Sequence, residues 1–419
     1  MPEPRRRPKD RKAQIASIAA EAFSEQGYHA VSMDDIANRV GVSAAALYRH
    51  SPSKYDMFRT AVLALSQQLV NATALSDDPT VTDQDATDQD AVQTFDRLIS
   101  ALVDTALANR TRGGVYRWGG RYLVDDDLAT LASHVRLVNT RLQEPIRILR
   151  PQLGSQQRWT LSVGVLAAIG SIVEHRAALS AARVHRLFGG MARALLWSPV
   201  PVDPGHQPVP AAPENRTTAG RFEAVLREAM RLFLKDGYRQ TTLDDIARAV
   251  GMPISGIYRY FPGKADILTA LFRRAADRLS ADTAVILATH SDPAAALQRL
   301  IHSYVLRSLE YPGIDSLYFT ERPNLSPTDA VLLRNMQRGT IDTWVGALTA
   351  AIPDLSGRDA RFMVLAAFAV AVDVGALARH RPDTTAGGDA ATEALMAAVL
   401  SADADALLSK GPGSALPFR

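Results

Sequence analysis

Residues 241–268 read TTLDDIARAVGMPISGIYRYFPGKADIL, and this stretch decides the fold. Thr241 or Thr242 is suited to cap a helix whose first turn carries two aspartates, where the helix dipole favours negative charge. Gly251 predicts a tight turn. A short helix is expected from about Pro253 to Tyr260, since proline is tolerated in a first turn. Two short helices joined by a glycine turn are the pattern of a helix-turn-helix unit.

The residues on either side predict two further helices. Apolar side chains upstream recur at three- and four-residue spacing, which predicts an amphipathic helix. They are Val225, Leu226, Ala229, Leu232 and Phe233. Gly237 is suited to the left-handed position that ends this helix. A longer helix is expected to begin near Ala265, after the break FPGK.

The same pattern occurs a second time, about 210 residues earlier in the chain. Residues 20–58 align without a gap with residues 230–268. Matched positions include Phe23 with Phe233, Gly27 with Gly237, Val40-Gly41 with Val250-Gly251, and Tyr48-Arg49 with Tyr258-Arg259. So wide a separation indicates duplication of a whole domain and not a solenoid repeat.

Low-complexity segments mark the domain boundaries. Residues 198–220 contain six prolines and predict an extended linker. The acidic stretch 76–91 predicts an exposed loop, and the tail 411–419 is expected to be disordered. We therefore expect an all-α protein of two tandem units. The helix-turn-helix domains would span 11–58 and 221–268, and the helical regulatory domains 59–197 and 269–408.

Both copies resemble the DNA-binding domain of the TetR/AcrR family of transcription regulators. The residues that carry the resemblance are VSMDDIANRVG…LYRHSPSKYDMF (31–58) and TTLDDIARAVG…IYRYFPGKADIL (241–268). The remainder of each unit resembles the family only in being helical and of suitable length. In this family the last two helices of each unit build a four-helix dimer interface, and the middle helices enclose a small-molecule pocket.

The resemblance implies a role for particular residues. Ser32 and Thr242 would cap the second helix and touch phosphate, and Lys54 and Lys264 would bind phosphate. The reading helix of the first copy would present Ser43, Ala44, Ala45, Tyr48, Arg49 and His50. That of the second copy would present Pro253, Ile254, Ser255, Tyr258, Arg259 and Tyr260.

The first copy departs from the family pattern at His50-Ser51, where the second copy has Tyr260-Phe261. Loss of the aromatic residue at position 51 is expected to weaken the packing of the third helix on the fourth, and hence DNA binding by this copy. A basic segment could compensate by lying along the minor groove or backbone. It consists of Arg5, Arg6, Arg7, Lys9, Arg11 and Lys12.

Structural explanations compete with functional ones at several of these positions. Ile36, Val40 and Phe23 belong to a core and not to a contact surface. For Tyr48 and Tyr258, a purely structural role is the alternative to DNA contact. The paired aspartates are better explained as charges at the start of a helix than as catalytic carboxylates.

The regulatory halves, 92–197 and 265–408, read as amphipathic or buried helices. The apolar character of 161–173 and 362–377 suits a buried helix interface. Candidate pocket residues are Trp118, Tyr122, Trp159, Tyr304, Tyr318 and Trp344, with His175 and Asp373 as further candidates. For each of them an ordinary core or surface position is the alternative.

Composition excludes several classes of protein. The 419 residues are 47% hydrophobic and 22% charged, with a net charge of +3, which is typical of a globular chain. Cysteine is absent, so disulfides and thiolate chemistry are excluded. No apolar stretch follows the basic N-terminus as a signal peptide would require, and the apolar runs are short for a membrane span. We expect a cytoplasmic protein with no metal or cofactor.

The main hypothesis is a ligand-responsive repressor that binds double-stranded DNA. Two unlike reading helices in one chain predict an internal pseudo-dimer on an asymmetric site, and pairing of two chains is a close variant. The alternative is a ligand-binding or protein-interaction module in which one or both copies have lost DNA binding. An enzyme is a poor third choice, because no phosphate-binding glycine loop, histidine cluster or catalytic triad stands out.

Overall fold

The computed structural model describes residues 11–74, 87–201, 220–310, 313–380 and 388–402. Their regular secondary structure is helical, with no strand in these ranges, which confirms the all-α class. The N-terminal residues 5–9, the C-terminal tail, and most of the expected linker and acidic loop lie outside the described residues.

The helices form two compact units. The first comprises Met1–Leu153 with Ile169–Arg176, and the second comprises Gly154–Ala168 with Ala177–Arg419. The division does not coincide with the proline-rich segment, because two helices of the first repeat contribute to the second unit. The domain boundaries expected above therefore remain a prediction about the sequence repeats and do not describe these units.

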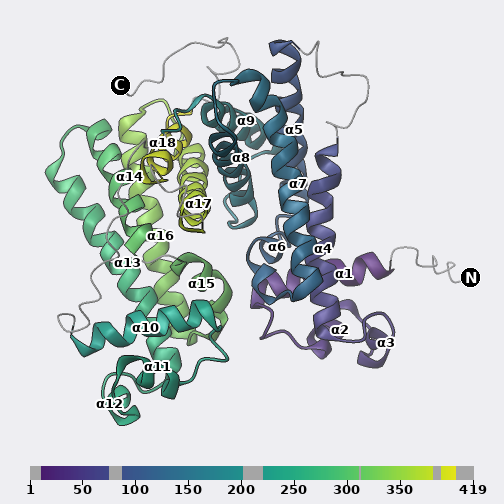
Figure 1. Cartoon of the computed structure of the whole chain (residues 1–419), viewed down its shortest axis with the longest axis vertical. Coiled ribbons are helices and arrows are strands. Elements are labelled where there is room, and N and C mark those ends of the chain that lie inside the picture. Colours follow the sequence, from purple (N-terminus) through teal and green to yellow (C-terminus); the bar gives the residue numbers. More distant parts are fainter. Residues whose placement is uncertain (1–10, 75–86, 202–219, 311–312, 381–387, 403–419) are drawn as a thin grey trace, which may run out of the picture. The chain divides into compact units, whose positions relative to one another are not determined.

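The first unit consists mainly of α1 to α7 (Figure 1). Their bounds are α1 Arg11–Gln26, α2 Met33–Val40, α3 Ala44–Tyr48, α4 Lys54–Ala72, α5 Asp88–Ala108, α6 Gly114–Gly119, and α7 Asp125–Leu149. The short turns η2 (Gly120–Tyr122) and η3 (Ser171–Val173) complete it. Helix α4 packs against α1, α5 and α7, so it connects the N-terminal helices to the regulatory ones.

The second unit contains most of α8 and all of α9 to α18. Their bounds are α8 Ser155–Gly170, α9 Ala181–Trp197, α10 Arg221–Lys235, α11 Leu243–Val250, α12 Ile254–Tyr258, α13 Lys264–Thr289, α14 Pro293–Glu310, α15 Ile314–Glu321, η4 Arg322–Asn324, α16 Pro327–Ala351, α17 Gly357–His380 and α18 Gly388–Leu400. Helices α10 to α12 lie at one end of the long helices α13 and α16 (Figure 1). Helix α18 packs against α9, α14 and α17.

Helix α17 is the one described helix that is long and apolar enough to cross a membrane. The segment concerned is Gly357–Leu377, and 61% of its most apolar window is buried inside the structure. A core helix passes the same test of length and composition, so the helix is weak evidence for a membrane. Its contacts with α14, α16 and α18 account for its apolar character.

Candidate nucleic-acid interface

The second head, which we define as α10 to α12 with the start of α13, is built by local signals in the sequence. Thr242 is the residue that caps α11: its hydroxyl accepts from the Asp245 amide at 3.1 Å and donates to the Asp245 carboxylate at 2.6 Å. Gly251 ends α11 with φ 73°, a left-handed backbone that disfavours side chains. Thr242 thus fixes where α11 begins, and Gly251 forms the turn through which the chain passes from α11 to α12.

Helix α12 is anchored on one side and exposed on the other. Ile257 is fully buried beneath it, whereas Tyr258 is 54% exposed and Tyr260 43% exposed. Ser255 and Arg259 are exposed as well. A short helix with an apolar anchor and an outward face of hydroxyl, phenol and guanidinium groups is suited to contact DNA phosphates and base edges.

The first head, α1 to α3 with the start of α4, repeats this geometry. Ser32 forms the same capping box with Asp35, and Gly41 has φ 74°. Leu47 is fully buried, Tyr48 is 51% exposed, and Ala45, Arg49 and His50 are exposed. Ser43 caps α3 through its hydroxyl, which accepts from the Ala46 amide at 3.2 Å. The aligned Pro253 offers no such cap.

The heads differ most at Ser51 and Phe261. Phe261 is buried, and its ring contacts Phe222 of α10 with centroids 5.0 Å apart. Ser51 is also buried, but its hydroxyl donates to the carbonyl of Ser53. The first head therefore lacks this ring contact with its first helix, and the expected loss of packing on the fourth helix stays a prediction.

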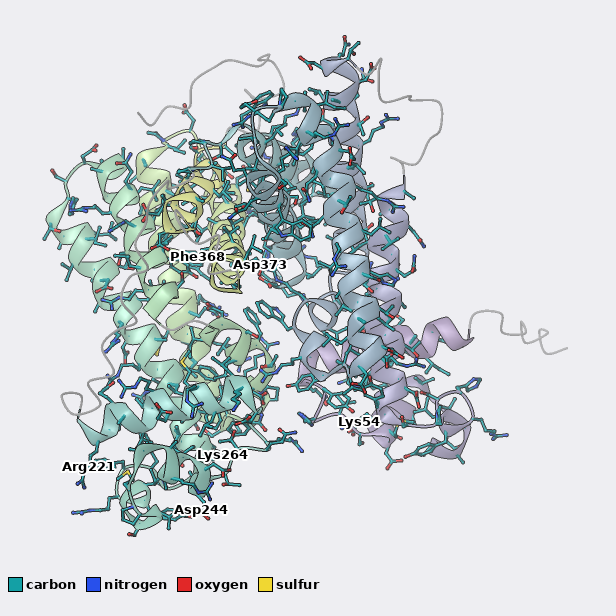
Figure 2. The ribbon with its side chains drawn as sticks, viewed as in Figure 1. Lys54, Arg221, Asp244, Lys264, Phe368 and Asp373 are labelled. Atoms are coloured by element: carbon teal, nitrogen blue, oxygen red, sulfur yellow. The ribbon has the colours of Figure 1, made fainter. Side chains whose placement is uncertain are left out.

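Lys54 and Lys264 begin α4 and α13 and occupy the same place in each head (Figure 2). The Lys264 ammonium donates to the carbonyls of Tyr238, Arg239 and Thr241 at 2.6, 3.3 and 2.8 Å, and it lies 4.5 Å from the Tyr238 ring centroid. Partial burial lowers its pKa, and the Tyr238 pKa is raised to about 12, chiefly by burial.

The Lys54 ammonium donates to the carbonyls of His29 and Val31 and lies 4.8 Å from the Tyr28 ring. Each lysine therefore ties the start of the fourth helix to the loop before the second. Phosphate binding by either lysine stays a prediction.

Comparison with known families decides what the two heads are. The family model described as "Bacterial regulatory proteins, tetR family" matches twice, at residues 15–61 and 225–271. The chain carries two DNA-binding domains of the TetR type. Its two TetR-type domains are the two heads described above, and the sequence repeat is a tandem duplication.

Several known regulators are similar to parts of this chain. The HTH-type transcriptional activator FasR of Mycolicibacterium smegmatis is 46% identical over 54 residues, which are 13% of this chain and 25% of FasR. The HTH-type transcriptional repressor KstR2 of Rhodococcus jostii is 28% identical over 156 residues, 36% of this chain and 74% of KstR2. Among solved structures, the ketosteroid regulator KstR2 of Mycobacterium tuberculosis has 23% identity and a TM-score of 0.36, covering 43% of this chain and 93% of that one. The chain thus spans a quarter of the length of FasR.

The second TetR-type repeat contains a cavity of about 170 Å³ among its middle helices. Two of the expected pocket residues, Tyr304 and Tyr318, line it. Phe272, Phe368 and Arg278 line it too and were missed from sequence, because no local pattern distinguishes them from core or surface residues. Figure 2 labels Phe368 and Asp373 on the same helix, α17.

The other expected pocket residues lie elsewhere. Trp344 is fully buried, and its ring contacts Tyr304 and Phe368. Trp118 donates its indole hydrogen to Glu174 at 3.1 Å. Tyr122 stacks on Tyr28 with centroids 5.3 Å apart, at the edge of the first head's core. Trp159 is half-buried on α8.

Proposed function

We propose that this TetR-family chain is a sequence-specific DNA-binding transcription regulator whose two heads read unlike half-sites. The observation that carries the proposal is the shared geometry of α3 and α12. Each helix buries one anchor, Leu47 or Ile257, and exposes a Tyr-Arg pair. Basic and hydroxyl side chains on a short exposed helix suit the major groove and the flanking phosphates.

The two reading faces are not equivalent in chemistry. Ala45 in the first head corresponds to Ser255 in the second, and His50 corresponds to Tyr260; all four residues are exposed. Different donors and acceptors favour different base edges. We therefore propose an operator with two unlike halves, spaced by one or more turns of about 34 Å.

A four-helix bundle of α8, α9, α17 and α18 supports an internal pseudo-dimer. A Cβ on Gly164 of α8 would meet Leu395 of α18 at 3.2 Å, Leu195 of α9 at 3.8 Å and Val374 of α17 at 3.9 Å. Helix α9 of the first repeat packs against α18 of the second within one compact unit. Phe188 and Phe362 meet edge to face at 6.3 Å, and Ser198 donates to the Ala394 carbonyl at 3.4 Å. Because the family pairs its subunits through the last two helices, one chain here supplies both partners of such a pairing.

The cavity of the second repeat is the proposed effector site. Its volume is roughly ten times the ~10–15 Å³ that one water needs. Phe272 and Leu333 line it and also belong to the hydrophobic core of the second head, and Tyr318 lines it and packs against that core. A bound molecule would therefore press on side chains that support α10 to α12, and differential affinity for two arrangements would shift their populations.

The aligned positions of the first repeat are buried. Val62, Leu65 and Ser66 correspond to Phe272, Ala275 and Ala276, and all three are buried. The Ser66 hydroxyl also lies 2.9 Å from Nδ1 of His134. We propose that effector sensing belongs to the second repeat, that it relieves repression, and that the protein acts in the cytoplasm without catalysing a reaction.

Selection of bound fragments from random duplex DNA tests the main proposal. The expected result is a motif of two unlike halves, and His50→Ala and Tyr260→Ala should each blur a different half. Recovery of a perfect palindrome, or of no enriched motif, would contradict it. The second outcome would favour the alternative of a ligand-binding or protein-interaction module, for which the reduced packing at Ser51 is the supporting observation.

A further inference from the structure

One ion pair in the four-helix bundle joins the first turns of α9 and α17. Nε of Arg183 lies 3.2 Å from each carboxylate oxygen of Asp359, and Nη2 lies 2.9 Å from Oδ2. The Asp359 side chain is only 5% exposed. Burial alone would raise the Asp359 pKa, but hydrogen bonds from Arg183 and Ser356 hold it below its ordinary value. The carboxylate is therefore ionised and dependent on its partner.

The duplicated repeats do not form an equivalent ion pair at the aligned positions of α8 and α18. Pro151-Gln152-Leu153 before α8 corresponds to Pro353-Asp354-Leu355 before α17, which places Gln157 opposite Asp359 in the alignment. In the other helix pair, the buried Leu187 and Phe188 correspond to the buried Leu395 and Met396.

This second register places Ala391 opposite Arg183. Gln157 is neutral, and its amide donates to the Val200 carbonyl at 2.7 Å. The acid and the base thus lie on unlike repeats, and neither repeat carries both.

Pairing of like repeats would remove from each of these two charges its partner in the ion pair. Two α8–α9 faces related by a two-fold axis would set each Arg183 against a glutamine, since an isologous interface repeats every contact. Two α17–α18 faces would set each Asp359 against an alanine. A buried charge that has lost its ion-pair partner is strongly destabilising. The loss therefore disfavours pairing between like repeats.

We propose that the Arg183–Asp359 pair selects the partner of this surface, so that the two repeats of one chain pair with each other and like repeats of two chains do not. The proposal rests on the pseudo-dimer proposed above. Its test measures molecular mass and cross-linking in the absence of DNA. Failure of the protein to bind an operator would therefore not affect the outcome of this test.

The full-length protein is the test object. Sedimentation velocity should give a single-chain mass of 45.3 kDa. Asp359→Asn removes the charge and should raise the fraction of two-chain dimers about tenfold at the same protein concentration. The reason is that pairing within one chain and pairing between like repeats of two chains become similar in energy. The exchange Arg183→Asp with Asp359→Arg restores a pair and should return the single mass.

Introduced cysteines identify the partner directly, because the natural chain has none. Ala178 and Arg358 are exposed and line one small hollow beside the pair. A double variant, Ala178→Cys with Arg358→Cys, treated with a short bismaleimide should lose both thiols without forming a double-mass band. A double-mass band would show pairing between chains and overturn the proposal.

Asp342→Asn is the matched control. It breaks the Arg361–Asp342 pair, which also involves α17 but leaves Asp342 52% exposed. This variant should keep the wild-type mass. Wild-type behaviour of a folded Asp359→Asn, verified by circular dichroism, would refute selection by the pair. If Asp359→Asn does not fold, the double variant Arg183→Asp with Asp359→Arg takes its place. Dimerisation of that folded variant would equally refute selection by the pair.

Discussion

The Phe261 ring packs against Phe222 with centroids 5.0 Å apart, while the aligned residues of the first head are Ser51 and Lys12. Phe261→Ser gives the second head the residue of the first and should destabilise it by about 3 kcal/mol, since a buried ring is lost. Amide hydrogen exchange over α10 and α12 should then accelerate about 100-fold. Tyr260→Ser alters an exposed neighbour and should cost less than about 1 kcal/mol. Equal effects of the two variants would contradict the assigned packing.

The left-handed end of α11 gives a second prediction. Gly251 has φ 73°, and a Cβ at this position would meet no other atom within 4 Å, so Gly251→Ala should cost about 1–2 kcal/mol through the backbone alone. Gly256→Ala is the control. Its methyl would meet the Met252 side chain, most closely at the flexible Cε end, and the first head already has Ala46 there. Thermal unfolding should rank wild type and Gly256→Ala together, above Gly251→Ala.

The capping box should make the second head sensitive to acid. Hydrogen bonds from Thr242 are the main cause of the lowered Asp245 pKa. A carboxylate with a lowered folded-state pKa stabilises the fold above the ordinary value of about 3.9, and this contribution is lost as pH falls through the folded-state pKa. Asp245→Asn should therefore lower the Tm at pH 7, and the deficit should shrink below about pH 4. Asp244→Asn, in the same turn but outside the capping box, should lower the Tm less at pH 7.

DNA binding should depend on salt through the exposed arginines. Arg259→Ala should weaken binding across sequences and reduce the magnitude of the log–log salt slope by about 1, because one phosphate contact is lost. Arg49→Ala should have a smaller effect if the less tightly packed first head binds more weakly. Arg338→Ala removes the same charge from an exposed position on α16 and serves as control. An unchanged slope for Arg259→Ala in fluorescence anisotropy would argue against α12 as a contact helix.

The cavity should bind a small aromatic anion. Titration calorimetry with 1-anilinonaphthalene-8-sulfonate is expected to show one site per chain, because the lining combines aromatic rings with Arg278. Ala276→Trp should fill the cavity and abolish binding. Arg273→Trp adds the same ring at an exposed position of α13 and should not. Retention of the dye by Ala276→Trp would place the site elsewhere.

The heads were predictable from sequence because their signals are local. Caps, left-handed glycines and apolar spacing each act within about one turn, and the observed helices follow them. Helix α6 lies within GGVYRWGG, whose glycines have a low helix propensity. Its glycines instead permit close packing: a Cβ on Gly113 would meet Val173 at 2.5 Å, and one on Gly119 would meet Phe58 at 2.8 Å.

Neither the cavity nor the ion pair was predictable from the sequence, because both depend on contacts between residues that lie far apart in the chain. Phe272 and Phe368 become neighbours of one hollow only through the packing of α13, α14 and α17. Trp344 was expected to line a pocket, yet it lies behind Tyr304 and Phe368. Arg183 and Asp359 meet across helices of different repeats, which no spacing along the chain reveals.

The mixed bundle of α8, α9, α17 and α18 also bears on how such a protein can evolve. In a homodimer each substitution appears on both sides of the axis, so a change that helps one half-site contact is imposed on the other. Here every substitution appears once. Each head is thus free to drift toward its own DNA sequence while the covalent link keeps the two present in equal number.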